Sequence, residues 1–257
     1  MTVEFAVADR VATVTIDRPD RMNAVNKRVE DELEKIWRDL ETRTDVSCVV
    51  LTGAGDKAFC VGADMKDVES EGASYWLESK PNGFGGIAFR RSLDLPVVAR
   101  VNGYALGGGF EMVLGCDIVI AAEHAKFGLP EGRVGRMPMD GGMVMLPRKI
   151  PFNQAMGMLF TGRHCTADEM RRFGIVNEIA PIEEIDKATR KWTRQIAALA
   201  PLSLRAIKQT INRTMHLSPS EAQCLKLPAV VDALCSEDGL EGVRAFQEKR
   251  APNWRGR

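Results

Sequence analysis

The sequence predicts an α/β core followed by a region made of helices alone. Strand and helix patterns alternate in the first fifty residues as strand, strand, helix and strand, which is typical of layered folds with crossover connections. From about residue 153 the pattern is mostly helical, and hydrophobic residues make up 45% of the 257 residues, enough for a sizeable core. We therefore expect a core over residues 1–195. The helical region, residues 196–257, is too small to fold alone and should pack on the core or on a neighbouring subunit.

The N-terminal elements follow from side-chain periodicity. Residues 11–17 alternate small or apolar with polar side chains, which indicates a half-buried strand. Asn26 is a candidate N-cap for an amphipathic helix over about 27–43. The apolar positions of that helix are Val29, Leu33, Ile36, Trp37 and Leu40. Residues 47–53 form a continuous apolar run that ends at a glycine and predict a buried strand.

The middle of the chain has an irregular stretch, residues 67–94. It contains an acidic run, Glu69-Ser70-Glu71-Gly72, and a glycine-rich run over 81–86, so a mobile loop or short helices that shape a pocket are expected here. The elements expected after it are a strand, a short buried helix and a strand, at residues 96–101, 108–115 and 117–122.

The C-terminal helices carry recognisable start and stop signals. Thr166 and Glu169 form a capping box that opens a helix, and Gly174 ends it before an edge strand over 176–180. Further helices are expected at residues 181–200 and 202–217, then after Ser218 with Pro219 at the first helical position, and after Ser236.

Charge and composition exclude several classes of protein. The chain has 35 basic and 35 acidic residues, and nucleic-acid binding through phosphates favours a basic excess, so no nucleic-acid partner is expected. Neither a signal peptide nor an apolar run long enough to span a membrane is recognisable, which predicts a cytoplasmic protein without a membrane partner. The six cysteines form no CxxC pair and lack zinc-type histidine spacing, so we expect free, buried thiols and no metal.

A glycine triplet, Gly107-Gly108-Gly109, follows a strand and opens the helix 108–115. Three glycines are costly unless the backbone bends sharply or something must approach it closely. The first N–H groups of a helix have no partner inside it, so a carbonyl oxygen placed over them would have its developing negative charge stabilised. A tight packing turn is an equally good interpretation of the triplet alone. Phosphate binding ranks low, because the run lacks GxGxxG and P-loop spacing.

Two glutamates lie twenty residues apart, and each follows a glycine-marked turn. Glu111 closes the triplet segment, and Glu131 closes Phe127-Gly128-Leu129-Pro130. A further small-residue turn, residues 58–66, follows strand 47–53 and could supply a second N–H donor. Two carboxylates beside such donors are what acid–base chemistry next to an oxyanion needs, although a solvated surface pair is the alternative.

Taken together, these residues resemble the crotonase, or enoyl-CoA hydratase/isomerase, superfamily. The resemblance covers essentially the whole chain in the family's order, and its combination of motifs is specific where each piece alone is not. The matching stretches are residues 17–24, 58–64, 101–111, 116–117, 127–131, 141–142, 146–148, 161–163, 174–177 and 246–250. Residues 83–86, 109–112 and the ending 253–257 look closest to carnitinyl-CoA dehydratase-like members.

The resemblance implies a fold and a reaction. The fold would be a crotonase-like ββα spiral with a C-terminal helical region that forms homotrimers, often paired into homohexamers. The substrate would be an acyl-CoA thioester with no permanently bound cofactor. The first hypothesis is a hydratase that adds or removes water across the 2,3 double bond. Alternatives are an acyl-CoA double-bond isomerase and a non-catalytic CoA- or RNA-binding relative.

The resemblance also implies roles for individual residues. Glu111 and Glu131 match the two catalytic glutamates, with Glu131 as proton donor to C2 and Glu111 as the group that activates water. The backbone N–H groups of Ala63 and Gly108 would form the oxyanion hole. The residues expected to bind CoA are Met22, Ala24, Ala63, Asp64, Met65 and Lys66, with Phe246 and Lys249 reaching it from the tail of the same or another subunit.

Some residues depart from the family's pattern. Gly132 follows Glu131 where relatives carry a side chain, which would loosen that glutamate. Asp140 could be a third acid–base group or the cap of the helix that follows, and we expect the cap. Phe110 and the methionines at 137, 139, 143 and 145 are candidates for an apolar pocket, but such a cluster is expected in the core more than in the pocket.

Overall fold

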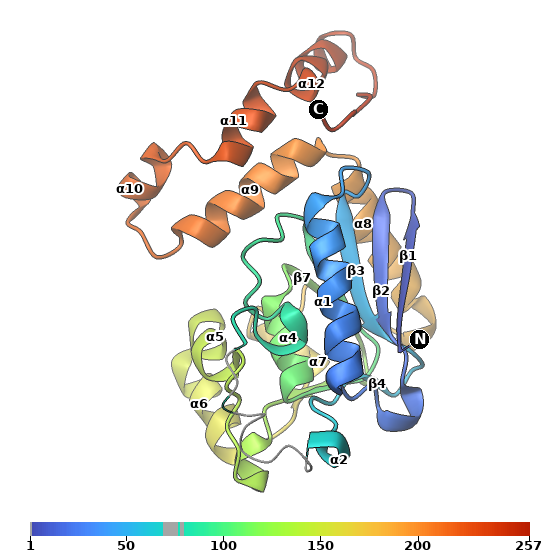
Figure 1. Ribbon diagram of the computed structural model, residues 1–257, viewed down its shortest axis with the longest axis vertical. Coiled ribbons are helices and arrows are strands. Elements are labelled where there is room, and N and C mark those ends of the chain that lie inside the picture. Colours follow the sequence, from blue (N-terminus) through green and yellow to red (C-terminus); the bar gives the residue numbers. More distant parts are fainter. Residues whose placement is uncertain (1, 69–76, 78–79) are drawn as a thin grey trace.

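The fold is built on two β-sheets. The computed structural model describes residues 2–68, 77 and 80–257. In the described residues the larger sheet has six strands in the order β1-β2-β3-β5-β7-β10, and only its β1 edge is antiparallel (Figure 1). Its strands are β1 (Val3–Ala8), β2 (Val11–Ile16), β3 (Cys48–Gly53), β5 (Val97–Val101), β7 (Ile118–Ala122) and β10 (Glu178–Ala180). The predicted α/β class and the edge strand near 176–180 are confirmed.

The smaller sheet consists of very short strands. They are β4 (Ala58–Cys60), β6 (Tyr104–Leu106), β8 (Lys126–Gly128) and β9 (Cys165–Thr166), in that order. The chain passes from a strand of the larger sheet directly to one of the smaller sheet three times, as β3–β4, β5–β6 and β7–β8. Sequence patterns predicted the segments around 58–60 and 127–128 only as turns, because a three-residue strand shows no readable period.

Two helices flank the larger sheet, and a third lies beside both sheets. Figure 1 shows α1 (Lys27–Thr42) in front of the sheet and α8 (Ile185–Ala197) behind it. Asn26 caps α1 by accepting a hydrogen bond from the N–H of Val29, as predicted. The short α4 (Gly108–Gly115) is buried along nearly its whole length and packs against β4 and β6. Other core helices in the described part of the chain are α2 (Met65–Val68), α5 (Gly142–Lys149), α6 (Phe152–Thr161) and α7 (Ala167–Arg172).

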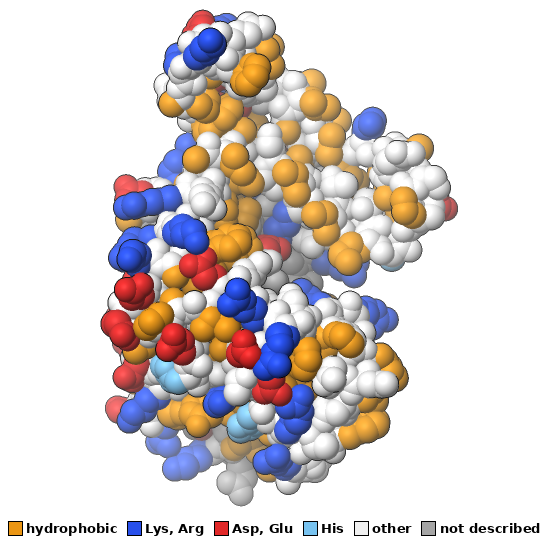
Figure 2. All heavy atoms as spheres, turned by 180° about the vertical axis from the view of Figure 1, so that it is seen from behind, with side chains coloured by type: hydrophobic (Ala, Val, Ile, Leu, Met, Phe, Trp, Pro, Cys, Tyr) orange, Lys and Arg blue, Asp and Glu red, His pale blue; other side chains and the backbone are white. Residues whose placement is uncertain are grey.

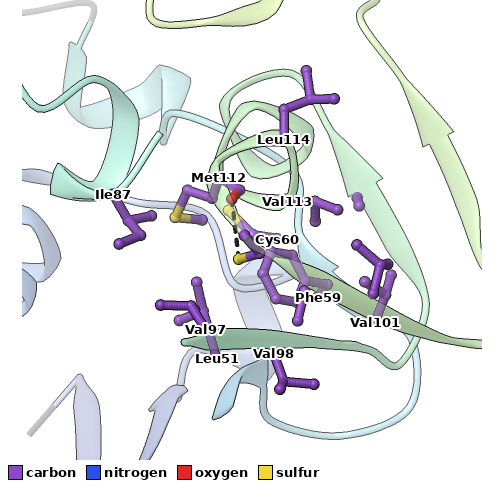
Figure 3. Close-up of a cluster of buried hydrophobic side chains, with 14 of the residues drawn as sticks. Leu51, Phe59, Cys60, Ile87, Val97, Val98, Val101, Met112, Val113 and Leu114 are labelled. Atoms are coloured by element: carbon purple, nitrogen blue, oxygen red, sulfur yellow. Dashed lines mark hydrogen bonds between the residues drawn. The ribbon is translucent and has the colours of Figure 1, made fainter. Parts of the chain in front are cut away.

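The core extends to the glycine triplet. Figure 3 shows side chains of β3, β4, β5 and α4 meeting in one cluster, in which Phe59 lies between the strands and Val113 of the helix. Met112 points to the turn at 84–86, where a Cβ on Gly85 would lie 2.3 Å from its sulfur. The N-terminus of α4 is therefore held by close packing on several sides, so its first N–H groups have little freedom to move.

The predicted helix boundaries differ from the structure in detail. The helix expected at 181–200 begins with a single 3₁₀ turn, Ile182–Glu184, before α8, and the one expected at 202–217 is α9 (Pro201–Thr214). The capping boxes at Thr166 and Ser218 are present, and Ser236 caps the last helix. Ser218 opens α10 (Pro219–Cys224), and Ser236 opens α12 (Glu237–Gln247). The helix between them, α11 (Pro228–Leu234), was not predicted. The acidic run Glu69-Ser70-Glu71-Gly72 lies outside the described residues.

The helical tail stands away from the sheets. In Figure 1, α9 to α12 form one end of the molecule, and α11 packs along α9. The tail is tied to the core by Lys208, whose ammonium donates to the carbonyl of Leu95 and the carboxylate of Asp117, both at 2.7 Å. The predicted domain boundary at residue 195 falls within the last turn of α8.

Much of the tail's surface is apolar, as Figure 2 shows for the face seen from behind. Its exposed large hydrophobic residues are Leu199, Ile207, Ile211, Met215, Leu225, Val231, Leu234, Leu240, Val243 and Phe246. Two of the six cysteines, Cys224 and Cys235, are also exposed here, so the expectation that all six thiols are buried is wrong. Within the described residues, no helix combines the length and apolar character needed to cross a membrane.

Candidate active site

The candidate site is a cavity of about 330 Å³ beside the N-terminus of α4. Its walls come from the turn after β4, from the start of α4 and from the segment between β8 and α5. The lining residues are Val61, Gly62, Ala63, Met65, Lys80, Phe84, Gly107, Gly108, Glu111, Pro130, Glu131, Arg133, Val134, Arg136, Met137, Met139 and Asp140. Both predicted oxyanion residues and both predicted catalytic glutamates therefore share one cavity.

The glycines of the triplet are required by close approach. Gly107 has φ of +54°, which favours glycine, and it is the N-cap of α4. A Cβ on Gly108 would lie 2.5 Å from the ring of Phe84, and one on Gly109 would lie 2.0 Å from the carbonyl oxygen of Cys60. The backbones of strand β4 and helix α4 are therefore in direct contact, with no room for a side chain between them. The packing-turn interpretation is therefore confirmed, and the same close packing fixes the N–H groups on which the oxyanion interpretation depends.

The turn after β4 faces the triplet. Gly62 has φ of +95°, and a Cβ there would lie 3.2 Å from the backbone nitrogen of Gly108. Ala63 pairs with Val25 in an isolated parallel bridge, which fixes its peptide plane. The N–H groups of Ala63 and Gly108 donate to no acceptor among the described residues, and both residues line the cavity. Two unpaired backbone donors at one cavity wall are the elements of an oxyanion hole.

Glu111 is a buried carboxyl on the first turn of α4, with 3% of its surface exposed. Its Oε1 accepts a hydrogen bond of 2.8 Å from the N–H of Gly142 at the start of α5. Burial, with the nearby negative charges of Asp140 and Glu131, raises the pKa of Glu111 to about 8, although the hydrogen bond from Gly142 opposes this. The group is therefore largely protonated at neutral pH.

Glu131 approaches from the opposite side, at the first position of a 3₁₀ turn, Glu131–Val134. A Cβ on Gly107 would lie 3.1 Å from its Oε1, which places the carboxyl against the glycine triplet. Burial raises the pKa of Glu131 to about 7. Its Oε2 is buried without a hydrogen-bond partner among the described residues. A buried carboxyl oxygen with no protein partner can accept a hydrogen bond from a ligand or from water.

Asp140 does not cap the following helix, so that expectation is wrong. Helix α5 begins at Gly142, and its N-cap is Gly141, which has φ of +148° and offers no side-chain bond. A carboxylate two residues before the first helical residue lies outside the capping position, and Asp140 lines the cavity instead. Burial raises its pKa, while the charge of Lys80 lowers it.

Of the residues predicted to bind CoA near the cavity, some line the cavity and others stabilise the adjoining turn. Met65 lines the cavity and is half exposed. The carboxylate of Asp64 is held by Arg18 at 2.8 Å and accepts from the N–H of Lys66, so it stabilises this turn. Met22 and Ala24 lie on the adjoining loop, where the carbonyl of Ala24 accepts from Arg18. Lys66 is exposed on α2.

Phe246 and Lys249 lie far from the cavity of their own chain. Phe246 lies in the last turn of α12 and Lys249 follows that helix, which Figure 1 places at the opposite end of the molecule from α2. Phe246 is 85% exposed, and Lys249 has φ of +51°. Neither residue lines the cavity of its own chain.

Two residues of the pocket wall come from the stretch 67–94, which the sequence predicted to shape a pocket without singling out individual side chains. Phe84 and Lys80 line the cavity, and Lys80 lies 5.8 Å from the ring centroid of Phe84. The glycines around Phe84 were a usable signal, because they allow its ring to reach Gly108. Phe110, for which the sequence favoured the core over the pocket, is fully buried against Phe127.

The methionines after Glu131 were expected in the core, and for Met137, Met139 and Met143 this is wrong. Met137 and Met139 line the cavity and are 54% and 43% exposed, and Met143 is 43% exposed outside the cavity lining. Sequence could not separate these methionines from Met145, which packs against the core, because no helical period covers residues 135–141.

Comparison with known proteins agrees with the fold and the motifs. The family profile described as Enoyl-CoA hydratase/isomerase matches residues 7–257. The chain belongs to this family.

Individual relatives are similar over their full length. Carnitinyl-CoA dehydratase from Proteus mirabilis is 37% identical over 251 residues, which cover 96% of this chain and 95% of that protein. The (E)-benzylidenesuccinyl-CoA hydratase of Thauera aromatica is 38% identical over 262 residues and all of both chains. The crystal structure of an enoyl-CoA hydratase from Bacillus anthracis superposes with a TM-score of 0.94 at 30% identity, covering all of both chains. The predicted resemblance to the crotonase superfamily and its carnitinyl-CoA dehydratase-like members is confirmed.

Proposed function

We propose that this protein is a hydro-lyase that adds water to, or removes it from, the 2,3 double bond of an acyl-CoA thioester. The observation that supports this most is the shared cavity. Two carboxyls with raised pKa and two unpaired backbone N–H groups face the same cavity. Relatives named as a carnitinyl-CoA dehydratase and a benzylidenesuccinyl-CoA hydratase support the same class of reaction.

The thioester carbonyl would lie between the N–H groups of Ala63 and Gly108. Negative charge develops on this oxygen as the 2-enoyl group becomes enolate-like, and two preorganised donors stabilise that charge more than the ground state. Removal of one such donor in other enzymes costs about 2.7–4 kcal/mol of barrier. The peptide planes at 63 and 108 are held by the Val25 bridge and by the packing of Gly109 on Cys60, so little reorganisation is needed.

The two glutamates would hold one water between them and share a proton. Burial raises the pKa of Glu111 to about 8 and that of Glu131 to about 7, so near neutral pH the pair shares one resting proton. In the direction of hydration, Glu111 accepts a proton from the attacking water at C3, and Glu131 donates a proton to C2. The shared water can first carry the resting proton from Glu111 to the unpaired Oε2 of Glu131.

The tail is proposed to complete the site of a neighbouring subunit within a homotrimer or homohexamer. Its exposed apolar residues offer a surface suited to another copy of the chain. Phe246 and Lys249 on this tail would then contact the CoA bound next to Met65 and Lys66 of the neighbour. CoA is carried as part of the substrate, and we propose no permanently bound cofactor.

The proposal is tested by following the absorbance of the conjugated enoyl thioester with crotonyl-CoA and longer or branched 2-enoyl-CoAs. A hydratase bleaches this band and yields the 3-hydroxyacyl-CoA, which mass spectrometry identifies by the added water. If no 2-enoyl-CoA is bleached and a 3-enoyl-CoA instead gains the band, the protein is an isomerase and the shared-water mechanism is wrong.

A further inference from the structure

Strand β4 has a register shift directly before the turn after β4, residues 61–63. Ala58 pairs with Tyr104 and Cys60 with Ala105, so three residues of β4 lie opposite two of β6. Irregularities of this kind re-aim side chains and are common next to active sites. Cys60 is the last residue of β4, and it is fully buried in the core cluster shared with α4 (Figure 3). It does not line the cavity, so its thiol lies behind the cavity wall.

The thiol of Cys60 holds the backbone of Gly62. Its Sγ accepts a hydrogen bond of 3.3 Å from the N–H of Gly62 and lies 4.0 Å from the carbonyl oxygen of the same residue. Among the described residues, this buried N–H has no other acceptor. Gly62 has φ of +95°, and glycine populates several backbone conformations readily, so the shape of this turn depends on such anchors.

The anchored glycine shares a peptide group with Ala63. The carbonyl of Gly62 and the N–H of Ala63 belong to one planar trans peptide, so they point in opposite directions. That carbonyl accepts a hydrogen bond of 2.8 Å from the N–H of Val25. Val25 therefore holds one edge of the peptide plane, and Cys60 holds the glycine from which the plane extends. The direction of the Ala63 N–H follows from both bonds.

Cys60 also contacts the helix that carries the second donor. A Cβ on Gly109 would lie 2.0 Å from the carbonyl oxygen of Cys60 and 2.9 Å from its Cβ, so α4 rests on this residue. The N–H of Gly108 belongs to the residue just before that contact. Val25 precedes α1, whereas Cys60 belongs to the strand on which α4 packs. Cys60 thus links the two donors, and an oxyanion hole needs its donors at a fixed separation.

We propose that Cys60 is a positioning residue whose thiol sets the direction of the Ala63 N–H relative to the N–H of Gly108. This inference rests on the proposed function, since it assumes that the thioester carbonyl lies between those two groups. Cys60 takes no part in proton transfer or nucleophilic attack. Burial raises the pKa of its thiol to about 12, so the thiol stays neutral and serves only as a hydrogen-bonding group.

Matched substitutions separate hydrogen bonding from packing. Cys60→Ser keeps an oxygen that can accept from the N–H two residues on, as serine does in turns, whereas Cys60→Ala has nearly the volume of serine and no acceptor. Cys48→Ala is the control, because Cys48 is also a fully buried core cysteine and its thiol makes no hydrogen bond within the described residues. If Cys60→Ala folds poorly, Cys60→Val takes its place, since valine fills the space without an acceptor.

Two measurements are made on the wild type and on each variant. Steady-state hydration of crotonyl-CoA gives kcat and KM. Infrared spectroscopy gives the carbonyl stretching frequency of bound butyryl-CoA labelled with ¹³C at its thioester carbon. Butyryl-CoA has no double bond to hydrate, so this spectrum reports the complex without turnover. Hydrogen bonds to the carbonyl oxygen lower the frequency, so a donor that is turned away makes this downshift smaller.

We expect Cys60→Ala to lower kcat about 10- to 100-fold, because a misdirected donor loses part of the effect of about 10²- to 10³-fold that one oxyanion donor supplies. KM should stay within about twofold, since the donor acts mainly in the transition state. The carbonyl downshift should shrink in the same variant. Cys60→Ser should keep kcat within about threefold and Cys48→Ala within about twofold of the wild type, both with the wild-type downshift.

Several outcomes would overturn the inference. One is a Cys60→Ala variant with the kcat and the carbonyl band of the wild type. Others are a Cys60→Ser variant as impaired as Cys60→Ala, or a Cys48→Ala variant with an equal fall in kcat, because packing alone would then explain the loss. If the wild type still hydrates crotonyl-CoA and shifts the band, these results refute only the role of Cys60. A wild type that hydrates no enoyl-CoA and leaves the band unshifted refutes the proposed function itself, and this inference with it.

Discussion

The two walls of the cavity are built in different ways. The wall formed by α4 and the turn after β4 is buried, and its glycines meet neighbouring backbone at distances that exclude any side chain, as at Gly109. The opposite wall, residues 131–139, is mostly exposed, and a Cβ on Gly132 would have nothing within 4 Å. Glu111 belongs to the first wall, and Glu131 begins the second.

The buried wall is suited to stabilising charge during the reaction, and the exposed wall is suited to recognising the substrate. Charge stabilisation requires donors fixed to within a fraction of an ångström, and backbone packed against backbone provides this. Recognition of an acyl group needs side chains that can differ between relatives without disturbing the core, and an exposed wall allows that. We therefore expect substitutions in the buried wall to damage catalysis, and those in the exposed wall to alter selectivity or do little.

The largest effect is expected from the two glutamates, where the walls must cooperate. Glu111→Gln and Glu131→Gln each remove a proton-transfer group with little change of shape, so kcat with crotonyl-CoA should fall about 10²- to 10⁴-fold. Steady-state kinetics with each variant, and circular dichroism to confirm folding, check this. A variant that retains more than a tenth of wild-type kcat would remove that glutamate from the mechanism, while loss at only one position would favour isomerisation through a single carboxyl.

The next effect is expected from Gly109→Ala in the buried wall. A Cβ there would lie 2.0 Å from the carbonyl oxygen of Cys60, so α4 must move away from β4 and carry the N–H of Gly108 with it. We expect a loss of about 10²- to 10³-fold in kcat, the effect of a displaced oxyanion donor, and about 1–3 kcal/mol of stability. Kinetics and urea unfolding measure the two losses. Full activity would show that the packing at Gly109 does not position the oxyanion hole.

A smaller effect concerns the pH dependence of stability. The pKa of Glu111 is about 8 in the folded protein against an ordinary value of 4.5, so between these pH values the folded state keeps a proton that the unfolded chain has released. The free energy of unfolding of the wild type should therefore fall as pH rises from about 5 to 8. Glu111→Gln lacks this penalty, so relative to the wild type it should gain stability over that range, on the order of a few kcal/mol.

Urea unfolding of the wild type and Glu111→Gln at both ends of this pH range provides the measurement. Glu183→Gln, which alters an exposed carboxyl in the 3₁₀ turn before α8, is the control and should track the wild type. A stability difference between Glu111→Gln and the wild type that does not change with pH would mean that Glu111 titrates as an ordinary carboxyl in the folded protein.

The smallest effect is expected from Gly132→Ala in the exposed wall. The added methyl group meets open space, and the residue lies outside the positive-φ region, so the change should only restrict the unfolded chain. We expect a gain of about 0.4–1 kcal/mol in stability and kcat within about twofold of the wild type. Thermal unfolding and steady-state kinetics of Gly132→Ala and Gly109→Ala, measured under the same conditions, compare the exposed wall with the buried wall. A loss as large as that of Gly109→Ala would show that the two walls are equally constrained.

Much of this architecture could be predicted from residues alone. Several elements follow from local patterns, which the folded protein keeps. They are the alternation of β2, the amphipathic period of α1 with its Asn26 cap, and the capping boxes at Thr166 and Ser218. The glycine triplet, placed between a strand and a helix, located the candidate oxyanion turn. The spacing of motifs along the whole chain identified the family.

The sequence by itself determined the class of fold and the family, and it predicted the pair of glutamates, because each follows from short-range periodicity or from the order of motifs along the chain. Tertiary structure decided the rest. It formed the smaller sheet from strands too short to show a period, and it buried Phe110 while placing Phe84 at the cavity. It also turned Asp140 away from the helix that it precedes and into the pocket. These outcomes depend on contacts between segments distant in the chain, where packing and burial, and not local propensity, set the energy of each side chain.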